Sequence, residues 1–345
     1  MIELLTDYGL FLAKSVTVLM VVLVVIMAAA NVASRQHRRA ESGHLQVRRL
    51  NEHVDGMRDT LRRKLLDTKA YRKLAKAEAK ARKKQVAQAA DRRRVWVLRF
   101  DGDLRASAVS ALREEITAIL TLARDGDEVV LCLESPGGMV HGYGLAASQL
   151  QRIRDRAGVK LTVAVDKVAA SGGYMMACLG ERILAAPFAL VGSIGVVAQV
   201  PNVHRLLKRN DIDMEVLTAG EYKRTLTVFG ENTPEGRAKF VEELEDIHAL
   251  FKEFVADARP NLDIARVATG EAWYGKRAIE LGLVDELMTS DEYVVRACED
   301  AEVHQVSWVE QRSTVDRLLH QGTSSLAAAL ERIWLRWRDR NTWTG

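Results

Sequence analysis

Short runs of β-branched and aliphatic residues recur between residues 95 and 217, with amphipathic stretches between them. Uninterrupted apolar runs of this kind are typical of strands buried on both faces of a parallel sheet. The pattern predicts an α/β fold of repeated strand-loop-helix units with mainly parallel strands. We expect helices at 112–119 and 145–153, and strands at 95–100, 128–133, 161–165, 182–186 and 214–217.

A longer helix is predicted after this region. Thr233 is a preferred N-cap residue, and Pro234 suits the first helical position. Apolar residues then recur at helical spacing, which predicts a stripe that faces the core: Phe240, Leu244, Ile247, Phe251 and Phe254.

The N-terminal region is apolar from about residue 8 to residue 33, apart from Lys14. This length is sufficient for a single helix to cross roughly 30 Å of hydrocarbon. A cleaved signal peptide is the alternative, but Glu3 and Asp7 stand where such a peptide has basic residues. The pattern therefore predicts a single-pass membrane anchor. The basic residues that follow it favour a cytoplasmic location for the rest of the chain.

Charge is distributed unevenly along the chain. Residues 34–94 contain 20 Lys or Arg and 7 Asp or Glu, whereas the whole chain carries a net charge of only +4. The segment is rich in Ala, Lys, Arg and Leu, which predicts a basic helical stalk. We favour contact with anionic lipid over nucleic acid, because Tyr71 is the one aromatic residue interleaved with the basic ones.

These patterns divide the chain into four parts: an anchor segment 1–33, the stalk 34–94, a catalytic domain 95–290 and a tail 291–345. The tail contains an amphipathic stretch, 326–338, that suits either a membrane interface or packing against protein. The three cysteines have no disulfide or zinc spacing, and Cys132 and Cys178 lie in apolar runs that predict burial. No cofactor or metal is expected.

A candidate nucleophile stands between a predicted strand and a short helix. Ser171 follows 161–165 and a turn of small residues, and Gly172 and Gly173 come directly after it. The N-terminus of a helix favours developing negative charge, and glycines allow a substrate backbone to approach. A helix-capping role for Ser171 is the alternative when the serine is considered alone.

A second loop between a strand and a helix contains Ser135-Pro136-Gly137-Gly138. Its backbone amides are suited to stabilise the oxyanion of an acyl-transfer intermediate. A plain tight turn is the alternative. Two such loops in successive strand-helix units can face one cleft, which favours the catalytic interpretation.

The base is harder to assign from residue types. His141 and His204 lack an obvious orienting acid, so Lys223 is the alternative. An ordinary lysine has a pKa of about 10.4, which makes it a poor base in water. Desolvation in a closed cleft lowers a lysine pKa by up to roughly 3 to 5 units, which removes most of that obstacle.

Four motifs together resemble the signal peptide peptidase A family. They are Leu133-Glu-Ser-Pro-Gly-Gly-Met-Val-His, Asp166-Lys-Val-Ala-Ala-Ser-Gly-Gly-Tyr, Gly192-Ser-Ile-Gly and Gly220-Glu-Tyr-Lys-Arg-Thr-Leu. The resemblance implies a fold similar to the Clp protease and crotonase proteins, and a catalytic dyad of Ser171 and Lys223. It also implies backbone oxyanion donors at Gly137 or Gly138 and at Gly172.

The resemblance further implies a ring of identical subunits, in which serine and lysine can come from adjacent protomers. It also implies that the anchor lies in a bacterial inner membrane. Family members usually have their catalytic domain in the periplasm, whereas the basic residues after the predicted anchor favour the cytoplasm. We therefore expect a membrane-anchored serine endopeptidase that acts on extended or membrane-derived peptides and does not bind nucleic acid. The alternatives are a crotonase-like coenzyme A enzyme and a non-catalytic membrane scaffold.

Overall fold

The computed structural model describes residue 16 and residues 43–87 and 92–310. The chain divides into a unit Leu45–Ser307 and a second unit that consists of Met1–His44 and Trp308–Gly345. All candidate catalytic residues lie in the first unit.

A seven-stranded sheet forms the centre of this unit, in the order β1-β10-β2-β3-β4-β6-β9. The neighbouring strands from β10 to β9 pair in parallel, which confirms the predicted α/β fold. The strands are β1 (Gly43–Arg49), β2 (Arg94–Asp101), β3 (Glu128–Glu134), β4 (Lys160–Val165), β6 (Arg182–Ala185), β9 (Glu286–Leu287) and β10 (Glu302–Glu310).

The central strands are mostly apolar because the sheet buries side chains on both faces. On one face, Leu98 and Leu131 pack in the core with residues of α4 (Val109–Leu122), α5 (Val140–Arg154) and α6 (Gly172–Ala177). On the other face, Val97 and Val130 pack with residues of α11 (Ser290–Asp300). Cys132 and Cys178 are buried thiols, as predicted.

A second sheet of three short strands lies next to the candidate nucleophile in the chain. Its order is β5-β7-β8, with β5 parallel to β7 and β8 antiparallel to it. Ser171 follows the last residue of β5 directly. The strands and the neighbouring short helices are β5 (Val168–Ala170), β7 (Leu190–Gly192), β8 (Ala272–Tyr274), α9 (Ile264–Val267) and α10 (Gly275–Ala278).

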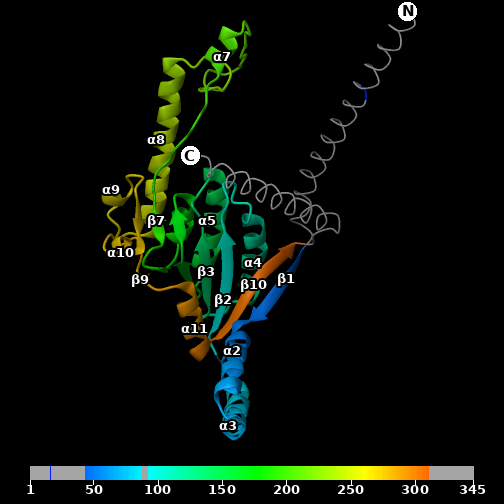
Figure 1. Ribbon diagram of the computed structural model, residues 1–345. Coiled ribbons are helices and arrows are strands. Elements are labelled where there is room, and N and C mark those ends of the chain that lie inside the picture. The colour runs from blue at the N-terminus through cyan, green and yellow to red at the C-terminus, as the bar shows by residue number, and fades with distance from the viewer. Residues whose placement is uncertain (1–15, 17–42, 88–91, 311–345) are drawn as a thin grey trace, which may run out of the picture. The chain divides into compact units, whose positions relative to one another are not determined.

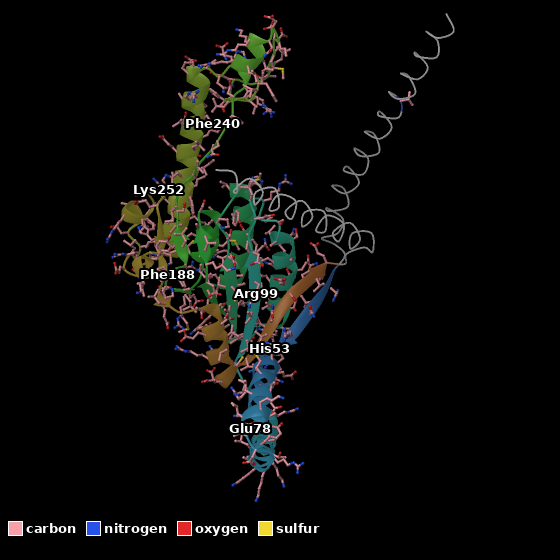
Figure 2. All side chains as sticks on the ribbon, in the orientation of Figure 1. His53, Glu78, Arg99, Phe188, Phe240 and Lys252 are labelled. Atoms are coloured by element: carbon pink, nitrogen blue, oxygen red, sulfur yellow. The ribbon has the colours of Figure 1, made fainter. Side chains whose placement is uncertain are left out.

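Helix α8 (Pro234–Ala258) starts where the sequence predicts, with the Thr233 side chain accepting a hydrogen bond from the Gly236 amide at 3.0 Å. The apolar stripe is core-facing only in its C-terminal half, where Phe251 is 4% exposed. Residues 197–233, here called the arm, lie beside the other half and contain α7 (His204–Arg209) (Figure 1). Figure 2 shows that Phe240 lies nearer than Lys252 to this outer end of α8.

The strand predicted at 214–217 is wrong. These residues have no regular secondary structure, and Leu217 is 89% exposed on the arm. Alternating apolar residues form a strand only when a partner strand accepts their backbone hydrogen bonds, and no described strand of this chain pairs with them.

Residues expected outside the catalytic domain contribute to the main unit. Within 34–94, β1 adds an edge strand, and α2 (Leu50–Leu65) and α3 (Thr68–Ala87) form a helical hairpin in which Arg62 pairs with Glu78 at 2.6 Å. Within 291–345, α11 covers one face of the sheet and β10 pairs with β2. The compact unit is therefore longer at both ends than the predicted domain 95–290.

The anchor predicted over about 8–33, apart from residue 16, and the amphipathic stretch 326–338 lie outside the described residues. Among the residues that are described, no helix combines the length and the apolar character needed to span a bilayer. The membrane anchor and the lipid contact of the basic segment remain predictions.

Candidate functional site

Ser171 occupies a strained junction between β5 and α6. Its backbone has φ 51° and ψ −119°, a conformation that is unfavourable for a residue with a side chain. Two backbone hydrogen bonds hold Ser171 in this conformation. The Ser171 amide donates to the Gly192 carbonyl at 2.8 Å, and the Met175 amide donates to the Ser171 carbonyl at 3.0 Å. Strain of this kind at the end of a strand is frequent at functional sites.

The Ser171 side chain does not cap the helix that follows it. Although Ser171 stands at the N-cap position of α6, its side chain makes no capping hydrogen bond. Within the described part of the chain its hydroxyl has no hydrogen-bond partner. The structure therefore removes the capping role that the sequence left open, and leaves the hydroxyl available for chemistry.

The loop of residues 135–139, here called the glycine loop, contacts Ser171 directly. Gly137 has φ 89°, and a Cβ atom at this position would lie 2.7 Å from both the Ala170 carbonyl oxygen and the Ser171 Cβ. A Cβ on Gly138 would lie 2.2 Å from the Leu104 carbonyl oxygen. Both positions therefore require glycine, which allows this loop to lie directly against Ser171.

The backbone amides around Ser171 differ in their hydrogen bonding. The Gly137 amide donates to the Ser135 hydroxyl at 3.1 Å. The Gly138 amide and the Gly172 amide, at the first position of α6, have no acceptor among residues 43–87 and 92–310. Amides that have no acceptor in the protein can donate hydrogen bonds to an oxyanion that forms beside them.

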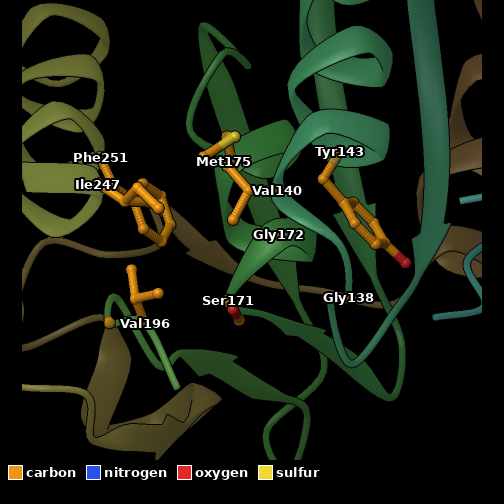
Figure 3. Close-up of a pocket in the computed structure, with 10 residues that line it drawn as sticks. Gly138, Val140, Tyr143, Ser171, Gly172, Met175, Val196, Ile247 and Phe251 are labelled. Atoms are coloured by element: carbon orange, nitrogen blue, oxygen red, sulfur yellow. The ribbon is translucent and has the colours of Figure 1, made fainter. Parts of the chain in front are cut away.

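An apolar pocket opens beside Ser171 (Figure 3). Its volume is ≈ 20 Å³, which gives room for little more than one water molecule. Part of its wall comes from α8, about 75 residues later in the chain than Ser171. The apolar side chains that line it are Val140, Met175, Val196, Ile247 and Phe251.

Lys223 lies at the other end of α8 in the same chain. It is exposed on the arm, and the adjacent Tyr222 ring stacks with Lys239 Nζ at 5.3 Å. Lys239 and the pocket residue Phe251 are twelve residues apart on α8, which at about 1.5 Å per residue is roughly 18 Å along the helix axis. A single chain therefore does not bring Lys223 to Ser171.

Neither histidine considered from the sequence reaches the pocket. His141 is exposed at the start of α5, and His204 begins α7 on the arm. The structure adds His248, whose Nε2 is buried without a hydrogen-bond partner among the described residues. Sequence reasoning missed it, although it lies between the pocket residues Ile247 and Phe251 on α8, because no motif surrounds it.

Sequence reasoning also missed Tyr143 and the contribution of α8 to the pocket. Tyr143 is fully buried, and its ring lies against Gly172, where a Cβ would be 2.4 Å from the ring. The apolar stripe on α8 was a usable signal, but periodicity does not distinguish a pocket wall from a core contact. Over the described residues, no cluster of His, Cys, Asp or Glu could hold a metal ion.

Comparison with known proteins gives family matches over both halves of the chain. Residues 3–150 match the family model "Peptidase family S49 N-terminal", and residues 153–304 match "Peptidase family S49". The chain is 48% identical over 342 residues to "Probable protease SohB" of Haemophilus influenzae, with 96% of each chain covered. It is 45% identical over 305 residues to "Probable protease SohB" of Buchnera aphidicola subsp. Schlechtendalia chinensis, covering 85% of this chain and 99% of the relative.

Among solved structures, a membrane-bound stomatin-specific protease in complex with a substrate peptide matches with a TM-score of 0.41 and 14% identity. The match covers 68% of this chain and 99% of that one. The two family matches include all four motifs that carry the family resemblance in the sequence.

Proposed function

Because the chain belongs to peptidase family S49 and is therefore a peptidase, we propose that it cleaves peptide bonds through an acyl-enzyme on Ser171, with Lys223 as the base. The membership confirms the resemblance predicted from the motifs. The substrate is a peptide or a protein. We further propose that Lys223 acts on Ser171 of a neighbouring copy of the chain.

The observation that carries this proposal is the free hydroxyl of Ser171 at a strained strand-to-helix junction, beside unpaired amides and an apolar pocket. In the first step, Ser171 Oγ attacks the substrate carbonyl and its proton passes to a neutral lysine Nζ. The amide C–N bond then breaks, and the lysine returns the proton to the leaving amine. Water, deprotonated by the same lysine, then attacks the ester carbonyl; the ester C–O bond breaks, and the lysine returns the proton to Ser171 Oγ.

The oxyanion would be held by backbone amides. Gly138 and Gly172 are the favoured donors because their amides have no other acceptor among the described residues. The Gly137 amide would need to exchange its bond to Ser135 for one to the oxyanion. Preorganised donors of this type typically contribute about 10²- to 10³-fold to kcat each.

The position of Lys223 supports a base supplied by the neighbouring copy. The arm that holds it exposes many apolar side chains, including Val197 at 83% and Leu217 at 89%. Large exposed apolar surfaces of this kind mark protein interfaces. Burial of the arm against another subunit in a ring would remove water from the ammonium group and favour its neutral form.

The pocket supports a preference for small apolar side chains at the cleaved position. Its lining is apolar, and its volume of ≈ 20 Å³ is too small for an aromatic side chain without movement of α8. Extended peptides such as remnants of signal peptides or segments of misfolded membrane proteins fit this chemistry. The anchor predicted over about 8–33 would hold the enzyme at the inner membrane, close to such substrates.

Covalent labelling tests the nucleophile. A fluorophosphonate probe should modify the full-length chain at Ser171, and Ser171→Ala should abolish both labelling and peptide cleavage. Ser148→Ala, an exposed serine on α5, is the matched control and should retain both. Cleavage that persists in Ser171→Ala would refute the proposal.

Mixed rings test the base. Ser171→Ala and Lys223→Ala chains should each be inactive, but co-expression should restore about a quarter of the wild-type activity if each site combines two chains at random. A site within one chain would give no recovery. As a control, mixing wild type with the doubly substituted chain should leave about a quarter of the sites active for a shared site and about half for a site within one chain.

A further inference from the structure

Ser135 connects the glycine loop to the strand that carries the nucleophile. Its amide donates to the Val168 carbonyl at 2.8 Å, and its carbonyl accepts from the Ala170 amide at 3.0 Å. Both partners are in β5, and Ser171 is the next residue of the chain. The carbonyl of Ser135 also lies against α6, since a Cβ on Gly173 would be 2.5 Å from it. The backbone of Ser135 therefore fixes one end of the glycine loop relative to Ser171.

The side chain of Ser135 starts a chain of hydrogen bonds with a fixed direction. The Gly137 amide donates to Ser135 Oγ at 3.1 Å, and Tyr143 Oη donates to the Asp103 carbonyl at 2.8 Å. The two hydroxyls are 2.5 Å apart. Because the Tyr143 hydroxyl donates its one proton to the Asp103 carbonyl, the hydrogen bond between the two hydroxyls must be donated by Ser135 Oγ. Each hydroxyl thus gives one hydrogen bond and accepts one.

This chain of hydrogen bonds is enclosed by protein. Ser135 and Tyr143 are both 0% exposed, so water does not compete for their hydroxyls. Burial raises the pKa of Tyr143, which keeps the phenol protonated and able to donate. Gly102 packs against the pair, because a Cβ there would lie 2.3 Å from Ser135 Oγ and 2.4 Å from Tyr143 Oη.

The glycine loop has no other side-chain hydrogen bond within the described residues. Its remaining support is backbone: the Met139 amide donates to the Leu104 carbonyl at 2.8 Å. Between these two attachments lie Gly137, whose amide donates to Ser135 Oγ, and Gly138, whose amide has no acceptor among the described residues. The buried hydroxyl of Ser135, which accepts from the Gly137 amide, is thus the side-chain group that holds this part of the loop in its conformation.

We propose that Ser135 and Tyr143 are positioning residues, which hold the glycine loop in the conformation that presents the Gly138 amide to the oxyanion on Ser171. This inference rests on the proposed peptidase function. Neither hydroxyl contacts the substrate in this scheme. They act by fixing the backbone of Gly137 and Gly138 through a buried pair of hydroxyls.

Two substitutions test the pair. Ser135→Ala removes the acceptor of the Gly137 amide, and kcat should fall about 10- to 100-fold while KM changes little, because a misplaced oxyanion donor affects the transition state most. Tyr143→Phe leaves that acceptor in place, so its effect should be smaller, about 3- to 10-fold. The double variant should be no slower than Ser135→Ala alone, since both changes interrupt one chain of bonds.

The matched control is Tyr174→Phe. Tyr174 is also fully buried and donates to a backbone carbonyl, that of Leu283 at 2.9 Å, but its hydroxyl is not bonded to the glycine loop. This variant should keep the wild-type kcat. All rates are expressed per reactive Ser171, titrated with the fluorophosphonate in the full-length protein, so that a loss of folded protein is not counted as a loss of kcat.

The outcomes separate this inference from the proposed function. If wild-type Ser171 does not react with the probe, the peptidase site itself is wrong. If the wild type reacts and Ser135→Ala keeps the full kcat per site, or raises only KM, the positioning role is refuted while the peptidase function stands. Should Ser135→Ala not fold, the comparison of Tyr143→Phe with Tyr174→Phe decides: equal kcat values would refute the inference.

Discussion

Gly137 and Gly126 have nearly the same positive φ angle but different surroundings. Gly137 has φ 89° and packs against Ser171, whereas Gly126 has φ 88° and would have nothing within 4 Å of an added Cβ. Substitution of each by alanine therefore imposes the same backbone strain, about 1–2 kcal/mol for an L-residue in the left-handed region. Any additional effect in Gly137→Ala comes from contact with the nucleophile.

The size of that additional effect follows from the contact distances. The new Cβ would lie 2.7 Å from the Ala170 carbonyl oxygen and from Ser171 Cβ, whereas ordinary contacts begin at 3.4 Å, so these groups must separate by about 0.7 Å. A displacement of about 1 Å at a catalytic site costs about 10²-fold in rate. Overpacking should also destabilise the fold by about 1–3 kcal/mol more than in Gly126→Ala.

The assay combines urea unfolding with peptide cleavage. Gly126→Ala should lose about 1–2 kcal/mol of unfolding free energy and keep the wild-type kcat per titrated site. Gly137→Ala should be less stable than that and at least about 30-fold slower per site. Equal stability and equal kcat in the two variants would show that the glycine loop does not contact Ser171 as described.

Three further predictions concern stability and specificity. Ile247→Ala should enlarge the pocket beside Ser171 and shift the preference of cleavage from Ala toward larger apolar side chains; an unchanged ratio of kcat/KM values would contradict this. Burial alone would raise the pKa of Asp127, but hydrogen bonds from Arg94, the Arg124 amide and Trp96 together outweigh it and hold this pKa below its usual range. Asp127→Asn should therefore cost about 3–5 kcal/mol in urea unfolding at pH 7, with a smaller difference from wild type as the pH falls through the low pKa of the folded state. Burial lowers the pKa of His304, so the unfolded chain binds its proton first and stability should fall as the pH drops below about 6.5. His304→Gln should flatten that slope, and an unchanged slope would mean that other groups cause it.

Local signals in the sequence were sufficient for much of the fold. The strands at 95–100, 128–133 and 161–165 appear as continuous apolar runs because both faces of the central sheet are covered, and the structure has them in those places. The start of α8 was also predictable from local residues, because the N-cap Thr233 and the proline after it act on the first turn of the helix. Ser171 and the glycine loop were also selected as candidates from residues close to them in the chain, and their catalytic roles stay predictions.

The tertiary structure decided how these local pieces are combined. Strand β10 pairs with β2 across about 200 residues, and α8 supplies the far wall of the Ser171 pocket; no periodicity carries that information. In the folded chain Lys223 lies near the start of α8 and Ser171 lies beside its second half, although the motifs predicted that both belong to one site. Sequence pattern fixes the conformation of a segment through nearby backbone and side-chain preferences. The partner that a segment packs against depends on burial of apolar surface and on hydrogen bonds between distant residues, which only the folded chain, or its assembly, determines.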